Sequence, residues 1–381
     1  GKLKNIMENQ KIKIGVIGCG MRIQCVLEHL LPSGEGRLEV VALYDPMPRG
    51  VEAIQNKFAP AAKVCSSEAE LLAIEEIDWV MIGSWNCFHA DQVVAALEAG
   101  KHIFCEKPLA TTLEGCVRIQ EAWRKKPDAC FFFGLVLRYT SIQQKVKEVI
   151  DSGVLGKLVS FEFNETLGFI HGGYIQGNWR RHRQNAGTHV LEKCCHDFDL
   201  ANWMTGSLPV KAASFGGRDF FIPSNRHLAD EAGYDEQGRV AYLSWSDPES
   251  VDPFSEGASI VDNQVAILQY ANGVRETFHT NCNAAIRERR MYIVGMKGVL
   301  RADSVTGRVE VCRVGFDQKP EVVMESKDEG GHYGGDEIMG RQLALTMLGQ
   351  VPPMVTLKEG IESAVSCFGV DAALDSGQVF D

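Results

Sequence analysis

The sequence predicts an α/β protein that opens with a doubly wound parallel sheet and continues into a part rich in antiparallel strands. Up to about residue 110, short strand-like runs alternate with helical stretches, which is typical of parallel βαβ units. Between residues 265 and 314, strand-like runs follow one another, with turns at Asn272-Gly273 and Lys297-Gly298. At 381 residues the chain is also too long for one ordinary core, so two domains are expected.

The individual elements follow from hydrophobic periodicity and from their boundary residues. In the first part we expect strands at 11–17, 39–44, 63–65, 77–83 and 102–105, with helices up to 31 and at 51–58, 67–72 and 90–99. In the second part a new strand pattern begins at 130–137, with further strands at 159–163, 207–219, 265–270, 274–280, 289–294, 299–303 and 309–314, and helices at 141–152, 187–200, 336–348 and 357–376. Residues 220–258 form a long, polar and acidic excursion, of the kind used as lids, oligomer arms or insertions.

Composition limits the classes of partner. The net charge of −11 argues against nucleic acid or an anionic membrane as the main partner. No apolar run approaches the ~20 residues of a membrane helix, and the polar start does not resemble a signal peptide. The twelve cysteines are scattered and form no Cys-x-x-Cys pair, which favours reduced thiols in a cytoplasmic protein.

A glycine turn follows the first strand. Gly18-Cys19-Gly20-Met21-Arg22 lies between that strand and a helix, and a second strand then ends at Asp45, which is the layout of a dinucleotide-binding βαβ unit, or Rossmann domain. Gly18 permits a tight turn, and Gly20 lets the backbone approach a pyrophosphate at the helix N-terminus. The sequence therefore predicts a dinucleotide site here.

Asp45 decides which dinucleotide is expected. Its carboxylate can accept hydrogen bonds from a ribose 2′-hydroxyl and would repel a 2′-phosphate, so NAD is favoured over NADP. Two features depart from the usual fingerprint. The third position is Ile23 rather than a small residue, so the helix must pack differently, and residues 32–37 lengthen the connection to Asp45.

The stretch Gly100–Ala110 carries the strongest local signal. Its apolar strand runs directly into Glu106-Lys107-Pro108. The proline biases Lys107 towards an extended backbone, which would hold the lysine at the carboxyl end of a strand, where open α/β sheets bind ligands. A solvated lysine at a surface strand end would show the same pattern.

Two further segments carry polar groups with more than one interpretation. Asn86 and His89 lie in a strand-to-helix loop at the presumed ligand edge, although His89 could simply start its helix with a local hydrogen bond. Residues 168–187 are rich in Gly, Arg and His and include the run 179–183, Trp-Arg-Arg-His-Arg. Such a cluster can bind an anionic group, or it can be a solvated basic loop.

The helix expected at 187–200 holds a candidate general base. Glu192 and His196 are four residues apart and therefore share one face, with His189 a turn earlier and Asp199 a turn later. A carboxylate beside an imidazole orients it and increases its basicity. A metal site is the competing interpretation, but the His-Glu-x-x-His spacing is missing; a purely structural histidine is another.

The chain resembles the Gfo/Idh/MocA family of NAD(P)-dependent oxidoreductases. The matching stretches are Gly18–Gly20, Asn86–His89, Ala99–His102, Cys105–Ala110, Arg138–Tyr139, Gly153–Lys157, the His196 segment and Gly295–Gly298. The resemblance implies a Rossmann domain followed by an α+β domain with a large, open-faced, mostly antiparallel sheet, and pyranoses, cyclitols or related polyols as substrates. It also implies that His196 is the base and Glu192 its partner, with Glu in place of the more common Asp, and that no metal is needed.

These observations lead to one favoured hypothesis and two alternatives. We expect a Rossmann domain at 10–129, an α+β substrate and oligomerisation domain at 130–356, and a C-terminal helix at 357–381 that packs back on the body. The favoured function is an NAD-dependent oxidoreductase acting on a hydroxyl carbon of a sugar, sugar acid or cyclitol, as a homodimer or homotetramer formed through the open sheet. The alternatives are a redox-neutral, NAD-dependent glycoside hydrolase acting on an acidic sugar, with a sulfonated sugar as one example, and a non-catalytic dinucleotide-binding protein.

The residues assigned to each role are as follows. The catalytic candidates are Lys107, His196 and Glu192. The candidate cofactor contacts are Gly18, Cys19, Gly20, Met21, Arg22, Asp45, Ser84, Trp85, Asn86, His89, Glu106 and Lys107. The candidate substrate contacts are Lys107, Arg138, Tyr139, Tyr174, Arg180, Glu192 and His196.

Overall fold

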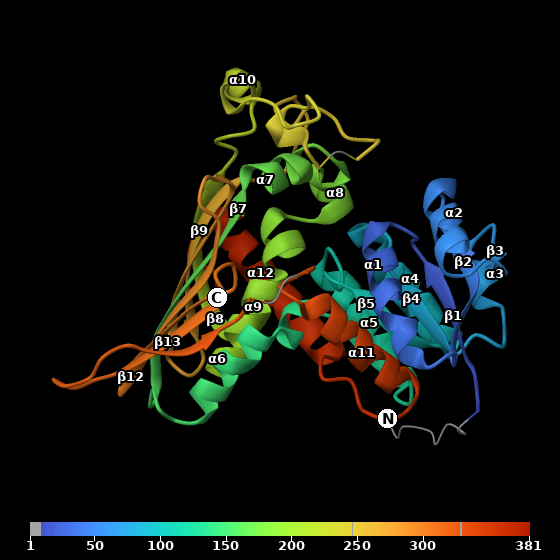
Figure 1. Cartoon of the computed structure of the whole chain (residues 1–381), viewed down its shortest axis with the longest axis horizontal. Coiled ribbons are helices and arrows are strands. Elements are labelled where there is room, and N and C mark those ends of the chain that lie inside the picture. Colours follow the sequence, from blue (N-terminus) through green and yellow to red (C-terminus); the bar gives the residue numbers. More distant parts are fainter. Residues whose placement is uncertain (1–8, 246, 328–329) are drawn as a thin grey trace. The chain divides into compact units, whose positions relative to one another are not determined.

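The computed structural model describes residues 9–245, 247–327 and 330–381 (Figure 1). The described chain forms two compact units. The first unit contains residues up to 140 together with 330–364, and the second contains 141–327 together with 365–381.

The first unit is built on a six-stranded parallel sheet in the order β3-β2-β1-β4-β5-β6. Its strands are β1 (Ile12–Ile17), β2 (Leu38–Tyr44), β3 (Lys63–Val64), β4 (Trp79–Ile82), β5 (His102–Glu106) and β6 (Phe131–Gly134). Its helices are α1 (Met21–Leu30), α2 (Pro48–Lys57), α3 (Glu68–Leu72), α4 (His89–Glu98), α5 (Leu113–Lys125) and α11 (Gly335–Met347), with short 3-10 turns η1 (Pro32–Gly34), η2 (Asn86–Phe88) and η3 (Val136–Tyr139). The order reverses beside β1, as in a doubly wound sheet, so the predicted fold class is confirmed.

Two elements of this unit differ from the sequence-based expectation. The segment beginning at 130 was expected to open the strands of the second domain, but Phe131–Gly134 is β6 and pairs in parallel with β5. The sequence pattern also did not predict α5, which begins where the hydroxyl of Thr112 accepts a hydrogen bond from the Gly115 N–H at 3.0 Å. This capping bond is a common signal for a helix start.

The second unit is built on an eight-stranded sheet in the order β14-β13-β12-β11-β7-β10-β9-β8. Its strands are β7 (Leu158–Gly168), β8 (Pro209–Gly217), β9 (Asn263–Tyr270), β10 (Arg275–Ala284), β11 (Glu288–Gly295), β12 (Gly298–Asp303), β13 (Arg308–Arg313) and β14 (Glu321–Glu325). The sheet is mostly antiparallel, as expected, but β7 and β10 pair in parallel. The sequence pattern did not predict β14.

The described part of the second unit also contains five helices besides the end of α12, and most residues of the long α9 are buried. They are α6 (Ser141–Asp151), α7 (Phe169–Gln176), α8 (Arg183–Ala186), α9 (His189–Thr205) and α10 (His227–Ala232), with 3-10 turns η4 (Trp179–Arg181), η5 (Pro223–Asn225) and η6 (Ala241–Leu243). The hydroxyl of Thr188 caps α9 by accepting from the Leu191 N–H at 3.1 Å. Gly206, with φ of +66°, ends it.

The last helix, α12 (Leu357–Ser376), starts in the first unit and ends in the second. Its second half packs on α9, where Thr188 hydrogen-bonds to Asp371 and the amide of Asn202 donates to the Ser366 hydroxyl at 3.1 Å. No disulfide joins any of the twelve cysteines, all of which lie in the described ranges. None of the described helices combines the length and hydropathy needed to cross a membrane.

Candidate active site

The glycine turn after β1 is locked to the end of β2. Gly18 has φ of +84°, and a Cβ added there would lie 2.2 Å from the backbone nitrogen of Ser84, so glycine is required. Asp45 closes the turn, because its Oδ2 accepts from the Cys19 N–H at 2.7 Å and its Oδ1 from the Met47 N–H at 2.8 Å. The acidic residue expected at a ribose therefore also fixes the turn.

The N-terminus of α1 fits the pyrophosphate of a dinucleotide. Its N-cap is Gly20, and no side chain of the described residues caps it. A Cβ added at Gly20 would meet nothing within 4 Å, and the next residue, Met21, is exposed. The helix thus presents its first N–H groups to open space, which favours an anion.

Ile23 explains how a helix without the third small residue still packs closely. Ile23 is fully buried, and a Cβ added at Gly83, just after β4, would lie 2.9 Å from its Cδ1. The small residue that close helix–strand packing requires is therefore supplied by the strand side of the contact. This confirms the expectation that the helix packs differently.

Arg22 joins three segments of the first unit. Its Nε lies 2.9 Å from Glu106 Oε1, and its Nη1 lies 2.6 Å from Asp336 Oδ1 at the start of α11. Burial opposes ionisation of Asp336, but hydrogen bonding with His332 and the charge of Arg22 outweigh it and hold the pKa of that carboxyl well below its usual range. The charge of Arg22, an expected cofactor contact, is therefore balanced by two carboxylates.

Lys107 lies where expected, directly after β5. Its backbone N–H donates to Glu106 Oε2 at 3.3 Å, and its side chain is half-buried. The Lys107–Pro108 peptide bond is cis. Glu106 itself is buried and hydrogen-bonded by Arg22. The backbone of Lys107 therefore lies at a rigid strand end.

His89 supports this turn from the neighbouring loop. Its Nδ1 lies 2.6 Å from the carbonyl oxygen of Pro108, and its Nε2 lies 2.9 Å from that of Ser84. Burial lowers the pKa of His89, while the two carbonyls act in the opposite direction. With both ring nitrogens at backbone carbonyls, His89 acts as a positioning residue that ties the loop after β4 to the turn at Lys107.

The remaining candidates of the first unit differ in exposure. Trp85 is 38% exposed and stacks on Phe88, with ring centroids 6.4 Å apart, whereas Asn86 is buried. Arg138 and Tyr139 are both buried in η3, and the Tyr139 ring stacks on Phe132 at 5.9 Å. Trp85 therefore offers a surface for a ligand, while Tyr139 packs in the core of its unit.

In the second unit, the candidate base His196 lies on α9. His196 and Glu192 are both buried, one turn apart on the same helix. Arg180 Nε donates to Glu192 Oε1 at 3.1 Å, and its Nη1 donates to the hydroxyl of Tyr174 at 3.3 Å. Three of the expected substrate contacts are therefore linked by hydrogen bonds.

His171 and Trp245, which were not predicted as site residues, lie next to Tyr174. The ring centroid of Trp245 lies 5.1 Å from that of His171 and 6.2 Å from that of Tyr174. Burial, followed by the charge of Lys193, holds the pKa of His171 well below its usual value. Trp245 lies in the excursion at 220–258, where the sequence carried no signal for a site.

The basic run at 179–183 does not converge on one anion. Arg181 donates to the hydroxyl of Ser255 at 2.8 Å and to the Ser255 carbonyl at 2.6 Å. Arg183 pairs with Asp375 at 2.9 Å. Of the three arginines, only Arg180 therefore reaches Glu192.

A buried ion cluster anchors α9 to the sheet beneath it. Arg289 Nε lies 2.8 Å from both Asp197 Oδ1 and Glu165 Oε2. Burial raises the pKa of Glu165 to about 6, against the opposing charge of Arg289. Since Asp197 directly follows His196, this cluster fixes the orientation of the helix at the candidate base.

His189 belongs to the core. Its Nε2 lies 2.9 Å from the hydroxyl of Thr280, and the ring lies beside Cys194 and Cys282. The described residues hold no cluster of three His, Cys, Asp or Glu side chains arranged to bind a metal.

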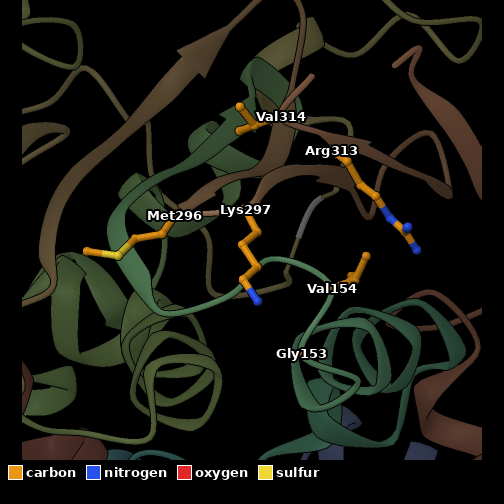
Figure 2. Close-up of a pocket in the computed structure, with 6 residues that line it drawn as sticks. All are labelled: Gly153, Val154, Met296, Lys297, Arg313 and Val314. Carbon is orange, nitrogen blue, oxygen red and sulfur yellow. The ribbon is translucent and has the colours of Figure 1, made fainter. Parts of the chain in front are cut away.

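An open hollow of about 420 Å³ lies elsewhere in the second unit, beside the turn between β11 and β12 (Figure 2). It is lined by Gly153, Val154, Met296, Lys297, Arg313 and Val314. None of the predicted site residues lines it, so it is not the candidate active site.

The fold and these residues define a class of protein, an oxidoreductase with a dinucleotide-binding sheet and a second, α+β part. The model of the oxidoreductase family with an NAD-binding Rossmann fold matches residues 12–133, and the model of the GFO/IDH/MocA C-terminal domain matches residues 143–301. The chain belongs to the Gfo/Idh/MocA oxidoreductase family.

Relatives and solved structures agree with this assignment. The chain is 24% identical to YteT of Bacillus subtilis, over 87% of this chain and 88% of that protein. It is 31% identical to an inositol 2-dehydrogenase of Salmonella typhimurium, over 51% of this chain and 54% of the relative. Two solved structures share the fold over 98% of this chain and 99% of theirs: a levoglucosan dehydrogenase complex with NADH (TM-score 0.79, 16% identity) and myo-inositol 2-dehydrogenase of Lactobacillus plantarum (TM-score 0.74, 20% identity).

Proposed function

We propose that the protein is an NAD-dependent dehydrogenase acting on a secondary hydroxyl group of a sugar, sugar acid or cyclitol. The observation that carries the proposal is the group on α9, where buried His196 follows Glu192 by one turn and Arg180 fixes the Glu192 carboxylate at 3.1 Å. Relatives named as inositol 2-dehydrogenases support a polyhydroxylated substrate.

Each residue has a defined task in this proposal. When bound, NAD supplies the nicotinamide that exchanges a hydride with the substrate carbon. His196 accepts the proton of the substrate hydroxyl, and Glu192 orients its imidazole. Lys107 donates a hydrogen bond to the same oxygen and stabilises the negative charge that develops there. Arg180, Tyr174 and Arg138 are proposed to bind further hydroxyl groups.

The cofactor preference is also a proposal. Asp45 already accepts from Cys19 and Met47, and a carboxylate retains acceptor positions beyond these two bonds. Those positions suit a ribose 2′-hydroxyl, while the negative charge disfavours a 2′-phosphate. NAD should therefore bind more tightly than NADP. The twelve free thiols support the expected cytoplasmic location.

The open sheet supports the proposed homo-oligomer. Phe215 is 75% exposed, Ile267 61% and Val265 49%, although all three lie on strands. Phe215 and Val265 are direct partners across β8 and β9, so their side chains share one face. We propose that a second copy of the chain covers this apolar part of the sheet.

Thermal-shift titration with NAD and NADP, followed by the absorbance of reduced nicotinamide against a panel of sugars and cyclitols, tests the function. We expect stabilisation by NAD and turnover with one substrate class. Lys107→Ala and His196→Ala should each lower kcat at least a hundredfold and leave the Kd for NAD within about threefold. Lys57→Ala, at an exposed ion pair with Glu28, is the matched control.

Two results would contradict the proposal. Unchanged turnover in Lys107→Ala would remove that residue from the chemistry. Release of an aglycone from glycosides without net reduced nicotinamide would instead support the redox-neutral hydrolase. The arginine cluster that motivated an acidic substrate for that alternative is not convergent, because Arg181 and Arg183 bind Ser255 and Asp375.

A further inference from the structure

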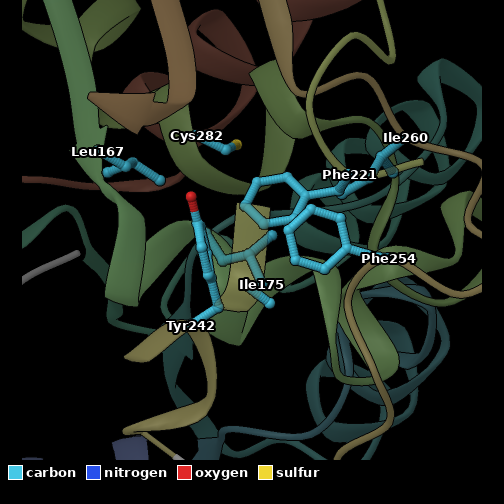
Figure 3. Packing of buried hydrophobic residues seen from close by; sticks show 8 residues of the cluster. Leu167, Ile175, Phe221, Tyr242, Phe254, Ile260 and Cys282 are labelled. Carbon is cyan, nitrogen blue, oxygen red and sulfur yellow. The ribbon is translucent and has the colours of Figure 1, made fainter. Parts of the chain in front are cut away.

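The excursion at 220–258 is a packed part of the second unit with its own apolar core. Phe221, Tyr242 and Phe254 pack against one another with ring centroids 5.3 to 5.7 Å apart (Figure 3). Ile175 of α7 and Cys282 of β10 belong to the same cluster. Burial of several large side chains gives this segment a fixed position rather than the mobility of a polar loop.

Backbone contacts hold the excursion against α7. A Cβ added at Gly173 would lie only 2.0 Å from the carbonyl oxygen of Tyr242, so η6 and α7 touch through their main chains. The Val251 N–H donates to the Gly177 carbonyl at 2.7 Å. Asp262 closes the segment, since its carboxylate accepts from the backbone N–H groups of residues 219, 220 and 221 at 2.8 to 3.0 Å.

This packing places Trp245 beside Tyr174, which is linked through Arg180 to Glu192. Trp245 follows η6 and meets Tyr174 edge to face, at 77° between the ring planes. Tyr174 in turn lies under the guanidinium of Arg180, 5.4 Å from ring centroid to Cζ, and Arg180 binds Glu192. A continuous series of contacts therefore leads from Trp245 to the helix that carries His196.

Along this series of contacts, the side chains change from charged near α9 to aromatic near Trp245. At the inner end, Arg180 and Glu192 offer charged hydrogen-bond partners for hydroxyl groups. At the outer end, His171, Tyr174 and Trp245 present aromatic rings, and Trp245 keeps 53% of its surface exposed although its segment is well packed. Packing alone does not account for a tryptophan that leaves much of its large apolar surface in solvent on a well-packed segment. A ligand that stacks on the ring would bury that surface.

We propose that Trp245, with His171 and Tyr174, forms an aromatic wall that receives the C–H face of a six-membered ring, so that the excursion selects pyranoses or cyclitols over open-chain polyols. This inference rests on the proposed function for the identity of the reacting site. A ring polyol has a flat face of C–H groups that stacks on an aromatic side chain, and hydroxyl groups around its edge that Arg180 and Glu192 can bind. An open-chain polyol has no such persistent face.

The test compares Trp245→Ala and Trp245→Phe with the wild-type protein. Phe316→Ala is the matched control, because Phe316 is a fully exposed aromatic residue of the same unit. Saturation-transfer difference NMR with myo-inositol, methyl β-D-glucoside and sorbitol, in the presence of NAD, reports binding without turnover. Steady-state kinetics with each of these compounds that the wild type oxidises then separates KM from kcat.

We expect Trp245→Ala to weaken binding of the ring compounds about tenfold, to raise KM by a similar factor and to change kcat by less than about twofold. Trp245→Phe should recover most of the affinity, and the thermal midpoint should change little because the side chain is half-exposed.

Three outcomes would overturn the inference. They are equal ring binding in Trp245→Ala and the wild type, equal loss of sorbitol and ring compounds, and no transfer from the wild-type protein to either ring compound. If transfer to ring compounds depends on Trp245 but the wild type oxidises none of a broad panel, the aromatic wall stands and the proposed dehydrogenase activity fails.

Discussion

Arg180 Nε lies 3.1 Å from Glu192 Oε1, and this bond joins the short turn η4 to the helix that carries His196. The guanidinium also lies over two rings, 4.4 Å from the Trp179 centroid and 5.4 Å from that of Tyr174. Burial opposes the charge of Arg180, but Glu192 outweighs it and raises the arginine pKa. The position of the Glu192 carboxylate on the helix of the candidate base is thus set by a largely buried ion pair.

Removal of one partner of this pair should cost more stability than removal of both. Glu192→Gln leaves the Arg180 charge without its counterion, and we expect a loss of about 3 kcal/mol in the free energy of unfolding. The double variant Arg180→Gln, Glu192→Gln leaves no buried charge uncompensated and should recover at least about 1 kcal/mol. Urea unfolding of the wild type, of Arg180→Gln and Glu192→Gln singly, and of the double variant measures this coupling. A loss in the double variant equal to the sum of the two single-variant losses would show that the pair contributes no coupling.

Asp45→Asn should relax the preference for NAD. The substitution removes the negative charge and keeps one oxygen to accept from Cys19 or Met47. We expect the ratio of the NADP and NAD dissociation constants to shift towards NADP by about tenfold, measured by fluorescence titration. Glu39→Gln, exposed on β2, the strand that Asp45 directly follows, is the control. An unchanged ratio in Asp45→Asn, or an equal shift in Glu39→Gln, would contradict the role given to Asp45.

The contribution of Glu276 to the free energy of unfolding should fall as pH rises from about 4 to 8. Burial, followed by the charge of Asp197, raises the pKa of Glu276 to about 8, although the Tyr270 hydroxyl, 2.6 Å away, acts in the opposite direction. The folded chain therefore keeps a proton that an unfolded glutamate, with a pKa of about 4.3, releases in this range. The contribution is complete below about pH 4.3 and is lost through pH 8, with a slope of up to about 1.4 kcal/mol per pH unit.

Glu276→Gln isolates this effect, because glutamine does not titrate and keeps an oxygen for the Tyr270 hydroxyl. Urea unfolding at pH 5 and pH 8 should show a smaller loss for the variant than for the wild type. Glu249→Gln, an exposed carboxylate of the same unit, should behave like the wild type. Parallel pH profiles for Glu276→Gln and the wild type would refute the assignment.

Ile267→Asp should disrupt the proposed oligomer. The side chain is 61% exposed on β9, so the folded monomer loses little packing, whereas a second copy against the sheet would bury the new charge. We expect light scattering to report a smaller mass for this variant at equal concentration. Phe316→Asp, on the turn between β13 and β14, should leave the mass unchanged. If light scattering shows that the wild-type protein is itself a monomer, the proposal of a homo-oligomer is wrong.

Local sequence signals located the elements of the candidate site. Gly18, Asp45 and Lys107 were predictable because each lies at the end of a strand with a strong apolar pattern, and parallel strands present such ends at one edge. Glu192 and His196 were predictable as neighbours because a spacing of four residues fixes them on one helix face whatever the helix packs against.

Contacts between distant residues were not predictable in the same way. The basic run at 179–183 looked like one cluster, but its arginines bind Glu192, Ser255 and Asp375, which lie 12, 74 and 192 residues away from them. Likewise, Arg22 meets Asp336 across 314 residues. No local pattern records which acid a given arginine reaches, since that choice depends on the packing of whole elements.

The sequence by itself determined the alternation of strands and helices, the glycine turn, the strand end at Lys107 and the face of α9 that carries Glu192 and His196. These features depend on backbone periodicity and on residues close together in the chain. Only the tertiary structure decided that β6 completes the first sheet, that β7 and β10 pair in parallel, and that Trp245 lies beside Tyr174. These depend on long-range packing, in which burial of apolar surface and satisfaction of buried charges outweigh local preference.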